Sequence, residues 1–292
     1  MFSNLLVATD LSLPSHHVVC ASASLKQLGA KKAVLLYCFK YPLDDSGMLA
    51  AQVMKSIEPE FNSQKKVLVD KGFEVLGRMI PVASYFAINN EADTEDCSLI
   101  VIGSAGQTMS KATRLGGVAS AVIHSATRPV LIFRVKFAED GGKTVCKECS
   151  FDMLEHILFP TDFSSTSERA YTYVQKMADC GAKQITLMHV QDKVKLDGKT
   201  EKDIAEFNAI DIGRLERLKT DLGKRGVKNV SIVMPYGLPK QEIVDYTHRN
   251  NISLVVMGSQ GRGYVKEFFL GSVSHTAARY SDSSVLLIPP LR

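Results

Sequence analysis

Short apolar runs alternate with longer amphipathic stretches along this chain of 292 residues. The runs are too short for helices and are typical of strands buried on both faces. In the first half they lie at residues 5–8, 33–39, 74–80, 99–102 and 129–134. In the second half they lie at residues 157–159, 184–190, 230–234, 254–257 and 285–288. The pattern therefore predicts five strands in each half.

The stretches between the runs have the spacing of helices. In the first half, helices are expected at residues 18–28, 47–70 and 82–92 and from Gly116 onward, with Pro59 interrupting the second. In the second half they are expected at residues 165–178, 200–224 and 239–249 and from Gly271 onward. Ser165 and Glu168 have the spacing of a capping box. Strands that alternate with helices imply parallel sheets covered on both faces.

The two halves repeat one another. Residues 7–12 match residues 159–164 at an offset of 152, and residues 99–104 match residues 254–259 at an offset of 155. Only small insertions therefore separate the two copies. The sequence predicts an α/β protein with two tandem, doubly wound domains of five parallel strands. The first domain is expected at 1–135 and the second at 153–292, with a linker at 136–152.

A glycine-rich segment follows the run at residues 254–257. Gly258 and Gly261 are separated by two residues, and after nine more residues come Gly271 and Ser272. Such glycines let backbone N–H groups approach an anion, and a helix that begins at Ser272 adds unpaired N–H groups. The spacing fits neither a Walker loop nor the dinucleotide fingerprint, which needs a glycine where Lys266 stands. It predicts a phosphate-binding loop of another kind; the alternative is a purely structural turn.

This spacing resembles the ATP-binding motif of the universal stress protein family, and the resemblance covers nearly the whole chain as two copies. It implies the adenine nucleotide alpha hydrolase-like, flavodoxin-like architecture of that family. It also implies a cleft for ATP, ADP or AMP, with magnesium accompanying ATP, in a protein of stress response or regulation without fast turnover. The alternatives are a slow ATPase or adenylating enzyme, and a scaffold whose cleft is vestigial.

The resemblance assigns roles to residues of the second half. The Asp162 carboxylate would accept hydrogen bonds from ribose hydroxyls, unless it caps the following helix. The backbone of Val190 would contact adenine, unless Val190 is plain core. Arg262 would reach the outer phosphate, unless it is a solvated side chain. The expected nucleotide-binding residues are Pro160, Thr161, Asp162, Val190, Met257, Gly258, Gln260, Gly261, Arg262, Gly271, Ser272, Val273 and Ser274.

The first half keeps only part of this pattern. Gly117 and Ala119 stand where the second half has serines, and Cys38 or Phe39 stands where it has Val190. Losing two neutral hydrogen bonds costs about 2 kcal/mol, or roughly thirtyfold in affinity. We therefore expect a nucleotide in the second half and an empty or altered pocket in the first. The weaker candidate site there consists of Thr9, Asp10, Gly103, Gly106, Gly116 and Gly117.

Composition and charge exclude some classes of function. The net charge is only +4 and there is no block of Lys or Arg, so no nucleic-acid partner is expected. No apolar run approaches the roughly 20 residues that cross a bilayer, and the N-terminus lacks the basic region of a signal peptide. Together with six irregularly spaced cysteines, this predicts a cytoplasmic protein without a membrane partner.

Two features of the sequence leave alternatives open. Cys146 and Cys149 have the spacing of half a structural zinc site, with His156 nearby, or of a redox pair. The third interpretation is a pair of inert thiols in the linker. The fifth strands of the two halves are expected to pair within the chain as a pseudo-dimer, and the sequence does not decide whether two chains also form a homodimer.

Overall fold

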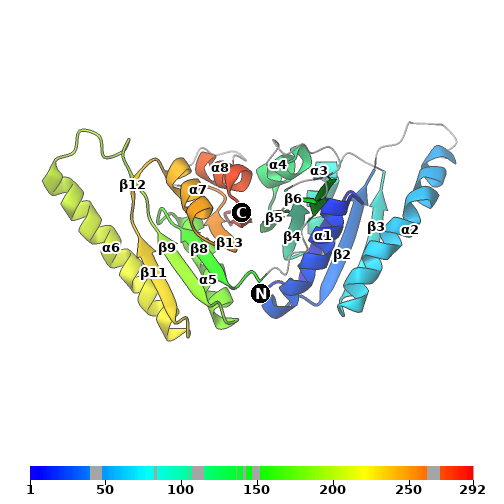
Figure 1. The fold of residues 1–292 in the computed structure, drawn as a ribbon, viewed down its shortest axis with the longest axis horizontal. Helices are drawn as coiled ribbons and strands as arrows, with labels where there is room; N and C mark the ends of the chain where they lie inside the picture. The colour runs from blue at the N-terminus through cyan, green and yellow to red at the C-terminus, as the bar shows by residue number, and fades with distance from the viewer. Residues whose placement is uncertain are drawn as a thin grey trace. The chain divides into compact units, whose positions relative to one another are not determined.

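A computed structural model describes residues 1–39, 48–81, 84–104, 106, 115–135, 137–140, 143–146, 152–261 and 270–291. The chain forms two compact units, Met1–Phe151 and Asp152–Arg292. Each unit contains five parallel strands with helices packed against them (Figure 1). The α/β class predicted from the sequence, with five parallel strands in each of two units, is thus confirmed.

The first unit has its strands in the spatial order β3-β2-β1-β4-β5. The strands are β1 (Asn4–Thr9), β2 (Lys32–Cys38), β3 (Glu74–Ile80), β4 (Leu99–Gly103) and β5 (Val130–Phe133). The α-helices are α1 (Leu13–Ala21), α2 (Met48–Asp70), α3 (Ser84–Thr94) and α4 (Gly117–Ser125), and a 3₁₀ helix spans Ser22–Leu28.

The second unit has the equivalent order β11-β9-β8-β13-β14. Its sheet consists of β8 (His156–Pro160), β9 (Gln184–Met188), β11 (Asn229–Val233), β13 (Leu254–Gly258) and β14 (Ser284–Ile288). The helices are α5 (Ser165–Asp179), α6 (Glu201–Lys224), α7 (Pro239–Arg249) and α8 (Ser272–Tyr280). A separate two-residue parallel pair joins β10 (Gln191–Asp192) to β12 (Tyr236–Gly237).

The direction of strand addition reverses between β8 and β13 in the second unit. Because crossovers between parallel strands are right-handed, helices on either side of the reversal cover opposite faces. Accordingly α7 packs on α8, and the Tyr171 hydroxyl of α5 donates to the Leu218 carbonyl of α6 at 3.0 Å. Both strands at the reversal are buried at every residue. The sheet centre is thus the core, and its carboxyl edge is where a crevice forms.

The first helix begins earlier than the sequence prediction of residue 18. Ser12 caps it, because its hydroxyl oxygen accepts from the Ser15 N–H at 3.3 Å, and Pro14 occupies the first turn. Beyond Ala21 the chain continues as the 3₁₀ helix, which ends at Gly29 with φ of +93°. The predicted end of this helical stretch at residue 28 is therefore confirmed, and the early start follows from the cap.

The proline in α2 does not interrupt the helix, contrary to the sequence prediction. Pro59 lies inside a continuous helix of 23 residues. An internal proline costs about 3 kcal/mol. On the same helix Phe61 and Leu68 are almost completely buried, and fully burying one large apolar side chain contributes about 1.5–3 kcal/mol. Tertiary packing therefore offsets the local penalty.

The capping box predicted at Ser165 and Glu168 is also wrong. The N-cap of α5 is Ser164, whose hydroxyl oxygen accepts from the Ser167 N–H at 3.3 Å. A reciprocal capping box occurs instead at the start of α6, between Thr200 and Asp203. The true cap of α5 lies one residue earlier because the preceding turn, described below, ends at Ser164.

The predicted linker contains regular structure. Its residues form an antiparallel hairpin of β6 (Phe137–Asp140) and β7 (Lys143–Cys146). The sequence did not predict this hairpin, because its strands contain charged residues and show no regular spacing of apolar residues. Of the cysteine pair, Cys149 lies outside the described residues and the side chain of Cys146 is not described, so the zinc and redox interpretations stay predictions. No helix in the described ranges is long and apolar enough to cross a membrane.

Candidate functional site

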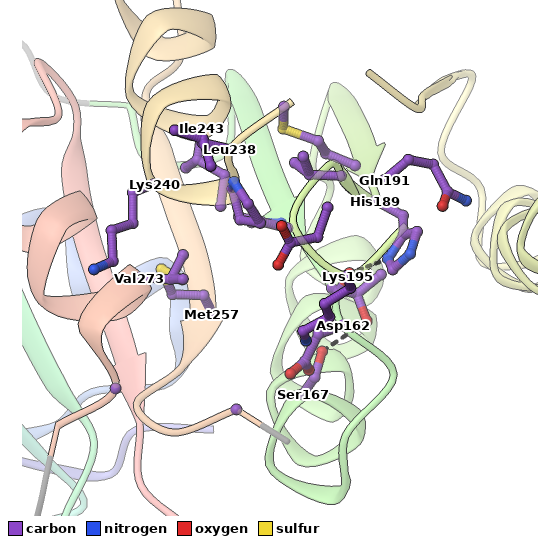
Figure 2. A pocket seen from close by; sticks show the side chains of 18 of the residues that line it. Asp162, Ser167, His189, Gln191, Lys195, Leu238, Lys240, Ile243, Met257 and Val273 are labelled. Atoms are coloured by element: carbon purple, nitrogen blue, oxygen red, sulfur yellow. Dashed lines mark hydrogen bonds between the residues drawn. The ribbon is translucent and has the colours of Figure 1, made fainter. Parts of the chain in front are cut away.

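One cavity of about 1030 Å³ opens at the carboxyl ends of β8, β9 and β13 in the second unit (Figure 2). It lies where the strand order reverses, the usual position of ligands in doubly wound sheets. Twelve of the thirteen residues expected at the nucleotide line it, and Arg262 lies outside the described residues. The twelve are Pro160, Thr161, Asp162, Val190, Met257, Gly258, Gln260, Gly261, Gly271, Ser272, Val273 and Ser274.

The glycines of the loop are required by close packing. A Cβ on Gly258 would lie 2.9 Å from the Thr166 Cγ2 of α5. A Cβ on Gly261 would lie 2.8 Å from the Asp162 Oδ2. Both distances are shorter than carbon atoms normally allow, so these positions exclude larger residues. Besides the close approach to an anion expected from the sequence, these glycines let the loop pack against α5 and Asp162.

The start of α8 presents backbone donors to the cavity. The Gly271 N–H donates to the Ser259 carbonyl at 2.7 Å, and the first intrahelical bond runs from the His275 N–H to the Gly271 carbonyl. The amides of residues 272–274 precede that bond, and the first turn has no acidic side chain. They therefore form the positive end of the helix, which suits an anion.

Of the serines in this turn, Ser274 uses its hydroxyl internally. Its Oγ donates to the Gly258 carbonyl at 2.8 Å and is buried. That bond ties α8 to the end of β13. The donors that this part of the site offers to an anion are therefore backbone amides, together with the exposed Ser272 side chain.

A tight turn after β8 positions Asp162. Its Oδ1 accepts from the Ser164 N–H at 3.1 Å, and the Thr161 Oγ1 accepts from the Phe163 N–H at 3.0 Å. Phe163 has φ of +56°, a left-handed conformation that is uncommon for a bulky residue. Ser164 caps α5, so the alternative in which Asp162 is the cap does not hold. The Oδ2 atom faces Gly261 at the cavity wall.

The backbone of Val190 is unpaired although the residue is only 8% exposed. Among the described residues, none forms a hydrogen bond with its N–H or its C=O. Buried backbone groups are almost always paired. A buried peptide group that lines a cavity and lacks a protein partner therefore indicates where a ligand or a water molecule bonds. This position is the one at which the family resemblance places the adenine edge.

Sequence reasoning missed a polar network on one wall. The Nδ1 of His189 lies 2.7 Å from the Thr161 carbonyl oxygen and therefore carries a hydrogen, and its Nε2 lies 3.4 Å from the Asp211 Oδ2. Arg214 bonds the other Asp211 oxygen at 3.2 Å. The Phe163 ring contacts His189 with centroids 4.8 Å apart and lies 5.1 Å from the Arg214 guanidinium carbon.

This network joins α6 to the ends of β8 and β9. The only local signal for it was the spacing of Asp211 and Arg214, which suits an ion pair on a helix surface. Other lining residues that the sequence analysis did not single out are Gln191, Asp192, Val194, Lys195, Leu196, Lys199, Phe207, Ile210, Leu238, Pro239, Lys240, Gln241 and Ile243. They make the wall part apolar and part basic.

The weaker candidate residues of the first unit repeat the turn. The Asp10 Oδ1 accepts from the Ser12 N–H at 3.1 Å, and Leu11 has φ of +62°. A Cβ on Gly106 would lie 2.5 Å from the Asp10 Oδ2. Thr9 differs from its counterpart Thr161, because the Thr9 hydroxyl also bonds the Gln64 Oε1 of α2 at 2.7 Å.

The remaining first-unit residues lie at element ends. Gly103 ends β4, Gly116 is the N-cap of α4, and Gly117 begins that helix. Strand register places Cys38, and not Phe39, at the position of Val190, since Ala8 pairs with Leu36 as Pro160 pairs with Met188. Burial and the nearby Glu91 carboxylate raise the pKa of the Cys38 thiol to about 11.

In the part of the chain that the structure describes, no group of three or more His, Cys, Asp or Glu side chains is placed to share a metal ion. The magnesium and zinc expectations thus stay predictions.

Comparison with known proteins identifies the family. The family model described as the universal stress protein family matches residues 1–134 and again residues 153–289. The chain belongs to the universal stress protein family. Each half of this universal stress protein carries one copy of the family domain, which agrees with the internal repeat seen in the sequence.

Curated relatives match half of the chain or less. A universal stress protein of Methanocaldococcus jannaschii is 29% identical over 155 residues, which cover 47% of this chain and 95% of the relative. The universal stress protein YxiE of Bacillus subtilis is 35% identical over 74 residues, covering 25% of this chain and 49% of that protein.

A solved structure covers both halves together. The crystal structure of a universal stress protein from Archaeoglobus fulgidus is similar with a TM-score of 0.72 and 22% identity, over 98% of each chain. At this identity the likeness concerns the fold.

Proposed function

We propose that the second unit binds an adenine nucleotide, AMP, ADP or ATP, in the cavity at the ends of β8, β9 and β13. The protein would act in stress response or regulation, as its family name suggests, without fast turnover. When ATP is the ligand, magnesium is its expected counter-ion. The first unit would bind nucleotide weakly or not at all.

The observation that carries the proposal is that one cavity is lined by two backbone sites without a partner among the described residues, the peptide groups of Val190 and the amides at the start of α8. The buried peptide groups of Val190 can bond the edge of a planar base, with apolar Leu238, Ile243 and Met257 lining the same cavity. The amides at the start of α8 suit phosphate. Asp162 can accept from sugar hydroxyls. A nucleotide is a ligand that needs all three kinds of partner.

The volume also suits such a ligand. Small-molecule and cofactor sites commonly measure about 300–1,000 Å³, and this cavity of about 1030 Å³ lies just above that range.

Calorimetric titration of the full chain with AMP, ADP and ATP tests the proposal. We expect one equivalent of nucleotide per chain. Mass spectrometry of small molecules released from the denatured protein would identify a ligand that co-purifies. Two equal sites would contradict the asymmetry between units, and the absence of any heat, thermal shift or co-purified nucleotide would support the scaffold alternative. Sustained phosphate release from ATP would instead support a slow ATPase.

A further inference from the structure

Lys240 occupies a position that helix energetics alone disfavour. It is the second residue of α7, directly after Pro239. A positive charge in the first turn faces the positive end of the helix dipole. The N-cap residue, Leu238, forms no side-chain capping bond, and the acidic residue of the first turn, Glu242, makes no ion pair with Lys240 in the described part of the chain. A residue that breaks a local rule without a local gain is a candidate for a functional role.

The side chain of Lys240 lines the cavity on the side of α8. Figure 2 shows it extending from the start of α7 toward Val273 at the start of α8. The two helices pack against one another, and both begin at the cavity wall. Lys240 is exposed and has no ion pair within the described residues. Its ammonium group is therefore available to a ligand beside the α8 amides.

Two other cations of the cavity are placed differently. Arg214 is already paired with Asp211 at 3.2 Å. Figure 2 places Lys195 on the side of the cavity where Asp162 lies. Of the labelled basic residues, Lys240 is the one beside the helix start that suits an anion.

We propose that Lys240 contacts the phosphate tail of the ligand and makes the cavity select ADP and ATP over AMP and adenosine. The proposal rests on the nucleotide binding proposed above and adds a specificity residue to it. A lysine donates from a point charge at the end of a flexible stem. It therefore follows a chain of phosphates without fixing their geometry, and each added negative charge strengthens the contact.

The test compares four probes, adenosine, AMP, ADP and ATP, by calorimetry on the full chain and on Lys240→Gln. Loss of a charge-assisted hydrogen bond is expected to weaken ATP binding about tenfold. Adenosine affinity is expected to change less than about twofold, because adenosine lacks the anionic tail. Lys240→Arg should restore most of the preference for ATP, and salt should weaken ATP binding to the wild type more than to Lys240→Gln.

Lys228→Gln is the matched control. Lys228 is also exposed, but it precedes β11 at the amino edge of the sheet and does not line the cavity. Its substitution removes the same charge and should leave all four affinities unchanged. The melting temperature of unliganded Lys240→Gln should equal or slightly exceed that of the wild type, since the substitution removes an unfavourable dipole interaction.

The outcomes separate this proposal from the one on which it rests. If the wild type binds ATP and Lys240→Gln keeps the ratio of ATP to adenosine affinity, Lys240 has no selective role and nucleotide binding stands. If Lys240→Gln weakens adenosine as much as ATP, its effect is structural and the proposal is overturned. If the wild type binds none of the four probes, both proposals fail.

Discussion

The two units share a backbone frame and differ in the side chains that cover it. Each has a turn after its first strand in which a bulky residue takes positive φ, Leu11 at +62° and Phe163 at +56°. In each, the aspartate of that turn lies against a loop glycine, with no room for a Cβ on Gly106 or Gly261. The repeated strain shows that both copies retain the geometry of the crevice floor.

The difference lies in the long helix of each unit. Gln64 of α2 is completely buried and bonds the Thr9 hydroxyl at 2.7 Å. A glycine with positive φ follows each long helix, Gly72 after α2 and Gly226 after α6. Gln64 lies eight residues before Gly72, and the residue eight positions before Gly226 is Leu218. Leu218 is only half-buried and does not line the cavity. In the first unit Gln64 therefore bonds Thr9, whereas the equivalent threonine of the second unit, Thr161, lines the cavity.

The side chains of the cavity wall near α6 also differ between the units. The second unit has His189 bridging to Asp211 of α6, and strand register gives Tyr37 as the equivalent of His189. Burial, and then the nearby charge of Asp10, raise the pKa of Tyr37. A duplicated frame therefore does not preserve a site, because the site depends on side chains from the long helix that change independently of the turn.

The largest expected effect comes from closing the glycine loop in one unit at a time. Gly261→Val would drive a side chain into Asp162, because even a Cβ at this position would lie 2.8 Å from the Asp162 Oδ2. Overpacking of this kind costs about 1–3 kcal/mol, so ATP affinity should fall by roughly fivefold to 150-fold. Gly106→Val is the matched change in the first unit and should leave ATP affinity within about twofold. Calorimetry checks both, and equal losses would contradict a site confined to the second unit.

An intermediate effect is expected from rebuilding the first unit toward the second. Gln64→Leu removes the glutamine bond of the Thr9 hydroxyl and leaves its bond to the Ser15 Oγ at 3.0 Å, the counterpart of the Thr161–Ser167 bond at 2.7 Å. Gly117→Ser restores a serine where a Cβ meets nothing within 4 Å. One regained hydrogen bond is worth about 1 kcal/mol, or roughly fivefold in affinity. At high ATP concentration the stoichiometry should rise from one toward two.

Gln52→Leu provides the control for that experiment, because Gln52 is an exposed residue of the same helix. It should leave the stoichiometry at one. A wild-type stoichiometry of two would show that Gln64 does not separate the units.

The smallest effect concerns stability. Tyr171→Phe removes hydroxyl bonds to the Asp221 Oδ2 at 2.8 Å and the Leu218 carbonyl at 3.0 Å, which join α5 to α6. It should lower the free energy of unfolding by about 1 kcal/mol in chemical denaturation at pH 7. Tyr246→Phe is the control, because none of the described residues bonds its hydroxyl. An equal loss in both variants would count against the role of this bond.

The same bond predicts a pH dependence. Burial raises the pKa of Asp221, but hydrogen bonds from Gln175 and Tyr171 and the charge of Arg225 lower it, and the net shift is downward. Because the folded pKa is below the unfolded one, the stabilisation is present above the unfolded value of about 3.9 and is lost as pH falls through the folded value. Tyr171→Phe should lose less stability than the wild type over that acid range.

Much of the fold follows from local sequence patterns. Buried parallel strands are short apolar runs whatever their partners are, so all ten sheet strands are visible in the sequence. The twelve lining residues could also be predicted from the sequence, because the glycine loop and the Asp162 turn are contiguous motifs at strand ends. Local patterns gave wrong predictions for details of the helices, such as the break at Pro59 and the position of the α5 cap. At these places packing or a neighbouring turn outweighs local preference.

The sequence by itself determined that this chain is a duplicated α/β protein, because periodicity and repetition are properties of neighbouring residues. Only the tertiary structure decided which side chains complete or occupy each crevice. Asp211 lies beside His189, α7 packs on α8, and Gln64 bonds Thr9 across separations that no local pattern encodes. Such contacts depend on how a long helix is seated on the sheet, which is set by the packing of the whole unit.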